Sequence, residues 1–69
     1  MKHAYIVLID KENENNNAAV ELTDGDFKEL VKICERAAAY VKKQDSFEAG
    51  WYNTVARNFK WCRRWLSKA

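Results

Sequence analysis

The fold is decided by residues 22–41, which read LTDGDFKELVKICERAAAYV. Thr23 and Asp26 form an acidic variant of the capping box that begins a helix, and Leu22 and Phe27 are spaced as a hydrophobic staple. Beyond them, apolar residues recur every three or four positions, as the core face of a helix requires. This face comprises Phe27, Leu30, Val31, Cys34, Ala37, Ala38 and Val41. We predict a helix over about 24–43.

Two short segments upstream favour β structure. Residues 3–9 (HAYIVLI) are rich in β-branched and aromatic side chains, and residues 18–22 (AAVEL) form a second, shorter candidate strand. Between them, residues 10–17 (DKENENNN) are polar and rich in asparagine, which indicates a loop. The simplest arrangement is an antiparallel hairpin with a long polar tip.

A second helix is predicted downstream, over about 47–66. Asp45 and Glu48 can form another capping box before it. Its predicted core stripe comprises Trp51, Val55, Phe59, Cys62 and Leu66. We therefore predict a single α+β domain over residues 1–69, an N-terminal β-hairpin followed by two helices (ββαα) that cover the sheet.

The first strand is apolar on both sides, because its odd-numbered and even-numbered residues point to opposite faces. Either the helices sandwich the hairpin, or a second chain covers it. A chain of this size buries only roughly 60% of its unfolded surface, which favours a homodimer through the first strand or a sheet face. Ile33 and Tyr40 form a second apolar stripe, which either packs within the chain or is an exposed contact patch.

The net charge of +2 conceals a strong asymmetry. Residues 1–30 carry three basic and seven acidic side chains, whereas residues 31–69 carry nine basic and three acidic ones. From Trp51 onward there is no acidic residue. An uneven distribution of charge of this kind indicates how the protein associates with other molecules and says little about its fold.

The last predicted helix carries the most distinctive surface. At about 100° per residue, its basic residues share the side opposite the core stripe, and a tryptophan lies beside them. A helix face that is only exposed to solvent needs charged side chains, but it does not need a tryptophan. The candidate binding residues are Arg57, Lys60, Trp61, Arg64, Trp65 and Lys68.

Four interpretations of this surface compete. It docks an acidic protein surface, since Trp and Arg dominate binding hot spots. It binds nucleic acid, with cations on phosphates and Trp61 stacked on a base. It lies on an anionic membrane, which is disfavoured because the core stripe must face the hairpin. In the purely structural interpretation, Trp61 folds back over a neighbouring aromatic ring and the cations are only solvated.

The predicted hairpin tip offers a secondary acidic contact through Asp10, Glu12 and Glu14. With Glu21, their spacing matches positions 1, 3, 5 and 12 of a calcium-binding EF-hand loop. Asn15 stands where that loop needs glycine, however, and a strand leads into it, so we predict no metal site. Cys34 and Cys62 are expected to be buried small hydrophobic residues.

No nucleophile–base set or phosphate-binding loop is recognisable, so we expect neither catalysis nor a cofactor. We find no membrane-spanning segment or signal peptide in the sequence and expect a cytoplasmic protein with reduced thiols. These features predict a small protein-binding module, an inhibitor or adaptor of a larger intracellular complex. Phage and mobile-element proteins directed at host defence machinery are one such class. The alternative is a nucleic-acid-binding module that uses the last helix.

Overall fold

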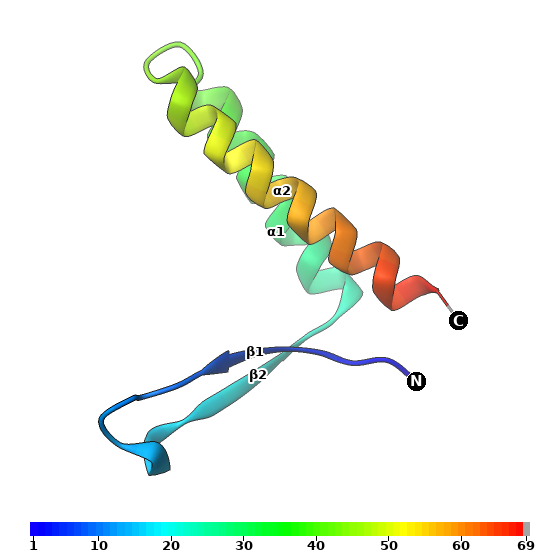
Figure 1. Cartoon of the computed structure of the whole chain (residues 1–69). Coiled ribbons are helices and arrows are strands. Elements are labelled where there is room, and N and C mark those ends of the chain that lie inside the picture. Colours follow the sequence, from blue (N-terminus) through cyan, green and yellow to red (C-terminus); the bar gives the residue numbers. More distant parts are fainter. Residues whose placement is uncertain (69) are drawn as a thin grey trace.

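The computed structural model describes residues 1–68 and shows two strands followed by two long helices (Figure 1). β1 spans Ala4–Leu8, β2 spans Ala18–Leu22, α1 spans Asp24–Val41 and α2 spans Ser46–Ser67. A single turn of 3₁₀ helix, η1 (Glu14–Asn16), lies in the hairpin tip. The predicted ββαα order is confirmed, and only the element ends differ, by one or two residues.

The hairpin pairs β1 and β2 in antiparallel register from Ala4 opposite Leu22 to Leu8 opposite Ala18. Its tip is organised by the carboxylate of Asp10, which accepts hydrogen bonds from the backbone N–H groups of Glu12 and Asn13. The side-chain amide of Asn16 donates a third bond to this carboxylate, over 3.1 Å. The polar tip is thus held by its own side chains.

Side chains near the helix starts satisfy N–H groups that lack partners within the helix. The backbone N–H of Thr23 donates to Oδ2 of Asp26 over 2.9 Å, and the N–H of Asp26 donates to Oγ1 of Thr23 over 3.2 Å. This reciprocal pair is the predicted capping box. Asp45 caps α2 by accepting a hydrogen bond from the N–H of Glu48 over 3.1 Å.

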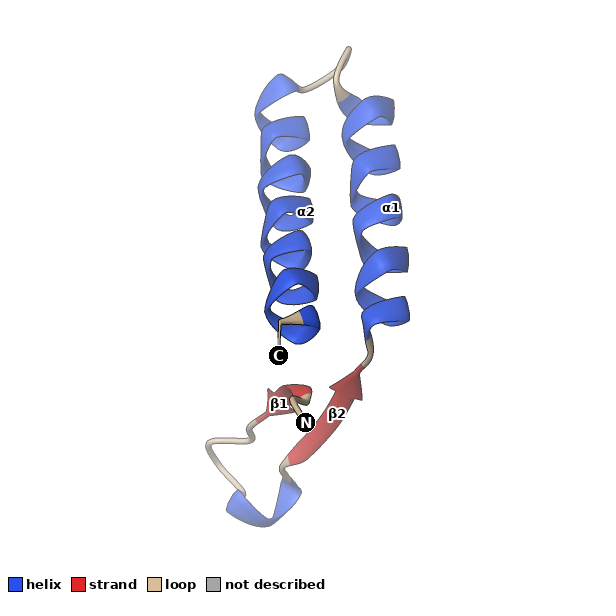
Figure 2. Ribbon diagram, turned by 90° about the vertical axis from the view of Figure 1, so that its right-hand side faces the viewer, coloured by secondary structure: helices blue, strands red, loops and turns tan. Residues whose placement is uncertain are grey.

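The core lies between α1 and α2, which run antiparallel and side by side (Figure 2). Its largest buried side chain is Phe27, whose ring centroid lies 5.8 Å from that of Phe59. The buried residues are Phe27, Val31, Ala38, Ala49 and Ala56. Because three of these five are alanines, the helices approach closely but bury little apolar surface.

The hairpin is not covered by the helices. It leaves the helix pair at the end where α1 begins, and no helix lies over either of its faces (Figures 1 and 2). Six apolar side chains of the hairpin region are 46–67% exposed: Tyr5, Ile6, Val7, Leu8, Ile9 and Val20. The prediction that the helices cover or sandwich the sheet is wrong.

The resulting molecule is flat and extended. Its principal extents are 44 × 37 × 14 Å, and its radius of gyration is 14.9 Å. A compact chain of this length has a radius of gyration of about 11 Å. The shortest dimension leaves room for one layer of structure, so neither the hairpin nor the helix pair has a second layer packed on it.

The predicted core stripe of α2 is wrong at Trp51, which is exposed. Residues two positions apart on a helix lie about 200° apart, so burying Ala49 against α1 turns Trp51 outward. Ile33 and Tyr40 on α1 are exposed as well, so the alternative in which this second stripe packs within the chain is wrong. No helix within residues 1–68 is long and apolar enough to cross a membrane.

Candidate binding surface on the C-terminal helix

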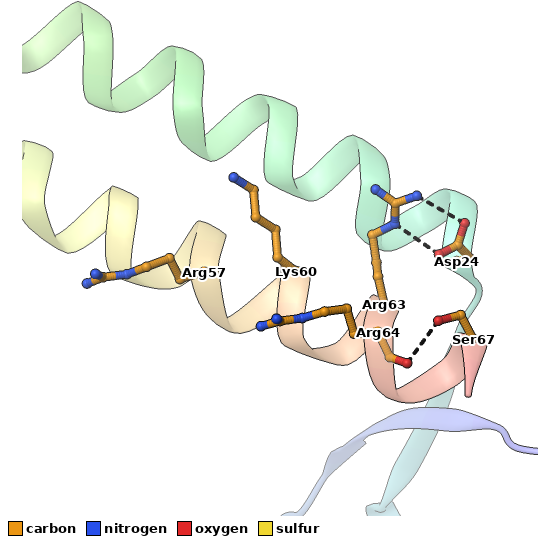
Figure 3. Close-up of a pocket in the computed structure, with 6 residues that line it drawn as sticks. All are labelled: Asp24, Arg57, Lys60, Arg63, Arg64 and Ser67. Atoms are coloured by element: carbon orange, nitrogen blue, oxygen red, sulfur yellow. Dashed lines mark hydrogen bonds and ion pairs between the residues drawn. The ribbon is translucent and has the colours of Figure 1, made fainter. Parts of the chain in front are cut away.

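The basic residues of α2 surround an open hollow of about 730 Å³, lined by Asp24, Arg57, Lys60, Arg63, Arg64 and Ser67. Arg57 and Arg64 extend in the same direction along α2, whereas Lys60 reaches toward α1 (Figure 3). The predicted basic face is therefore divided between cations that reach toward α1 and cations that extend along α2.

Two cations of α2 bind acidic residues of α1. Arg63 holds Asp24 with two hydrogen bonds, of 2.9 Å from Nε and 3.3 Å from a terminal nitrogen (Figure 3). The guanidinium of Arg63 lowers the pKa of Asp24, and this carboxylate raises the pKa of Arg63 in return. Lys60 contacts Glu35 over 3.0 Å. Arg63 and Lys60 therefore join the two helices.

Arg57, Arg64 and Lys68 remain available to another molecule. Within residues 1–68, no acidic side chain lies within ion-pair distance of any of the three, and all three are exposed. The side chain of Arg57 makes a hydrogen bond within α2, where it donates to Oγ1 of Thr54 over 3.2 Å. Their charge is not neutralised by the described part of the chain.

An aromatic stripe runs along the outer side of α2. We define it as Phe47, Trp51, Trp61 and Trp65, which are 40–86% exposed. At about 100° per residue these four fall within an arc of about 80°, and they span about 27 Å of helix. The arc lies opposite the buried Ala49 and Ala56, on the side of α2 turned away from α1.

The aromatic stripe meets the available cations near the C-terminal end of α2. Trp61, Arg64, Trp65 and Lys68 line a second, smaller hollow of about 200 Å³. The ammonium of Lys2 lies 4.9 Å from the ring centroid of Trp65 and donates to the Trp65 carbonyl over 2.9 Å. Trp61 is exposed, so the interpretation in which it folds back over a neighbour is wrong.

Five of the six predicted binding residues are exposed and make no ion pair with α1, and Lys60, which contacts Glu35, is the exception. Phe47 and Trp51 belong to the same surface but were missed. Their signal is present in the sequence, because Phe47 and Trp51 are four residues apart, as are Trp61 and Trp65, and both pairs project to one arc. Because Trp51 was assigned to the predicted core stripe, the two aromatic pairs were not recognised as one exposed stripe.

The acidic residues of the hairpin tip have different roles. The side chain of Asp10 is used within the tip, and hydrogen bonds from Asn16 and from the N–H of Glu12 hold the pKa of Asp10 below its usual value. Glu12 and Glu14 are exposed at the end of the hairpin that lies far from α2 (Figure 1). Acidic and basic surfaces are therefore separated within one chain.

Cys34 and Cys62 are free thiols and only half-buried, so the expectation of full burial is wrong. Among residues 1–68, no group of three His, Cys, Asp or Glu side chains is placed to hold a metal ion. Comparison of the chain with protein-family models, curated proteins and solved structures finds no match.

Proposed function

We propose that this chain is a small protein-binding module that docks the outer side of α2 on an acidic surface of a larger cytoplasmic complex, as an inhibitor or adaptor. The observation that carries the proposal is the aromatic stripe, four exposed aromatic side chains in line on a single helix. Encoding by a phage or mobile element, with host defence machinery as the target, is the specific setting that we propose.

The composition of this surface favours a protein as the partner. Tryptophan and arginine supply much of the energy at protein interfaces, since each combines a large contact area with a polar group that selects its partner. Trp61 and Trp65 share a hollow with Arg64 and Lys68, so apolar contact and charge act at one place. Arg57 extends the positive charge toward the middle of the helix and favours an acidic partner.

Affinity capture from the organism's lysate, with and without nuclease, identifies the partner, and titration of the purified partner then tests the surface. We expect Trp61→Ala to weaken binding by about 30-fold or more, the effect of losing a hot spot of about 2 kcal/mol. Tyr40→Ala is the matched control, because Tyr40 is an exposed aromatic residue on α1. The proposal is wrong if Trp61→Ala and Trp51→Ala both bind the partner as the wild type does.

Nucleic acid is the alternative outcome of the same experiment. In that case nuclease abolishes capture, and binding to an oligonucleotide weakens steeply as salt increases. Arg64→Glu then has a larger effect than Trp61→Ala, because phosphate contacts supply most of the affinity. This pattern would replace the protein-binding proposal with nucleic-acid binding by α2.

A further inference from the structure

The outer edge of β1 is an unprotected strand edge. The described sheet has only two strands, so the edge of β1 that faces away from β2 has no strand beside it. Natural proteins protect such edges with charges, proline or a covering element, yet Ala4–Leu8 reads AYIVL. A two-stranded hairpin alone is marginally stable, and a third strand is usually needed. Residues 4–8 thus carry the sequence of an interior strand.

The chain exposes more surface than a compact monomer of its mass. The chain exposes 5893 Å², whereas a compact monomer of its mass exposes about 4,500 Å². The excess is about 1,400 Å² per chain, or about 2,800 Å² for two copies, which lies within the range of obligate homodimer interfaces. A second copy of this chain, paired along β1, would cover part of this excess.

The sequence of β1 is complementary to itself when the two copies are antiparallel. A two-fold axis normal to the sheet at Ile6 places all five residues of β1 opposite all five residues of the second copy. Tyr5 then faces Val7 of the second copy, and Ala4 faces Leu8 of the second copy. An aromatic residue thus meets a β-branched one, which is a favourable cross-strand pair.

Charge selects the same register. Continuing the pairing beyond β1 places Lys2 opposite Asp10 of the second copy, once at each end of the symmetric strand pair. In the dimer the Lys2 ammonium would exchange its contact with Trp65 for this carboxylate, which continues to accept the hydrogen bonds of its own tip. A two-fold axis at Tyr5 would instead place Lys2 opposite Leu8. An axis at Val7 would place Ala4 and Tyr5 opposite residues that lie outside β1. Opposite charges that face each other across strands stabilise the pairing.

We propose that β1 pairs antiparallel with β1 of a second copy about a two-fold axis at Ile6, which makes a symmetric dimer with a four-stranded sheet in the order β2-β1-β1-β2. This proposal goes beyond the proposed function, because it uses the hairpin, whereas the docking surface lies on α2. A dimer would carry two α2 surfaces and would bind a repetitive partner with avidity. The two proposals can fail separately.

Sedimentation equilibrium between about 1 and 200 µM tests the dimer. We expect a mass of twice 8.1 kDa at the higher concentrations. Val7→Lys should give a monomer, because it removes both Tyr5–Val7 pairs and places two like charges on one sheet face, on either side of the axis at Ile6. Ile33→Lys should remain a dimer, and it is a matched control, since Val7 and Ile33 are each 59% exposed. A monomeric wild type at 200 µM, or dissociation by Ile33→Lys but not by Val7→Lys, overturns the proposal.

A charge exchange tests the register and the identity of the partner. Lys2→Asp and Asp10→Lys each place like charges together at both ends of the strand pair and should weaken dimerisation at least tenfold. Mixed in equal amounts, the two variants should form a heterodimer, because both Lys–Asp contacts are then restored between the copies. Native mass spectrometry distinguishes the heterodimer by mass. A mixture that associates no better than the separate variants excludes this register.

Discussion

Phe27→Ala should remove most of the stability of the fold, because Phe27 is the largest side chain in a core of five residues. Phe27 is 4% exposed and packs against Phe59. Truncating a buried phenylalanine costs about 3–5 kcal/mol, because apolar contact is lost and a cavity remains. A domain of this length has a total free energy of unfolding of about 3–10 kcal/mol. The substitution should therefore remove about a third or more of the free energy of unfolding.

Phe47→Ala is the matched control, because Phe47 is 86% exposed. We expect it to change the free energy of unfolding by less than about 0.5 kcal/mol. Urea unfolding followed by far-ultraviolet circular dichroism measures both variants, at one protein concentration because association adds to apparent stability. With an m value near 1 kcal/mol/M, Phe27→Ala should lower the midpoint by about 3 M or leave no transition. Equal destabilisation by the two variants would refute the helix-pair core.

Three further predictions concern helix capping, helix packing and acid stability. Thr23→Ala should lower the free energy of unfolding by about 1 kcal/mol in urea, because Thr23 caps α1. Ala56→Leu should lower it by about 1–3 kcal/mol through overpacking between the helices, whereas Leu at the exposed Ala39 should be neutral. Arg63 lowers the pKa of Asp24 in the folded protein below the ordinary carboxyl value of 3.8. The pair therefore stabilises the fold fully at a pH above 3.8, and this stabilisation is lost as the pH falls through the lowered pKa. The difference in Tm between wild type and Asp24→Asn should therefore be constant above about pH 5 and shrink below pH 3.8, and a difference that grows in acid would contradict the pairing.

Local signals predicted the elements of this fold well. The capping box at Thr23 and Asp26 fixes where α1 begins, and it acts between residues close in sequence. The polar run between two apolar segments likewise predicted the hairpin, whose second strand has the expected bounds. Features of this kind need no knowledge of the rest of the molecule.

The packing between elements was not predictable in the same way. The periodicity of α2 shows which residues share a side, but the depth of burial is set by how closely the second helix approaches. Small residues at Ala38, Ala49 and Ala56 allow close approach, so the buried side of α2 is centred on alanines rather than on Trp51. The apolar pattern of β1 indicated burial on both faces, but nothing in it determined whether the helices or a second chain would provide it.

Concentration-dependent amide hydrogen exchange tests most directly whether a second copy completes the β1 edge. The dimer predicts that exchange in residues 4–8 slows markedly as the concentration rises from about 1 to 200 µM, because amides on the outer edge become hydrogen-bonded. Exchange in residues 18–22 should change much less, since β2 keeps its outer edge open in the proposed sheet. Equal exchange of residues 4–8 at every concentration would contradict the paired edge.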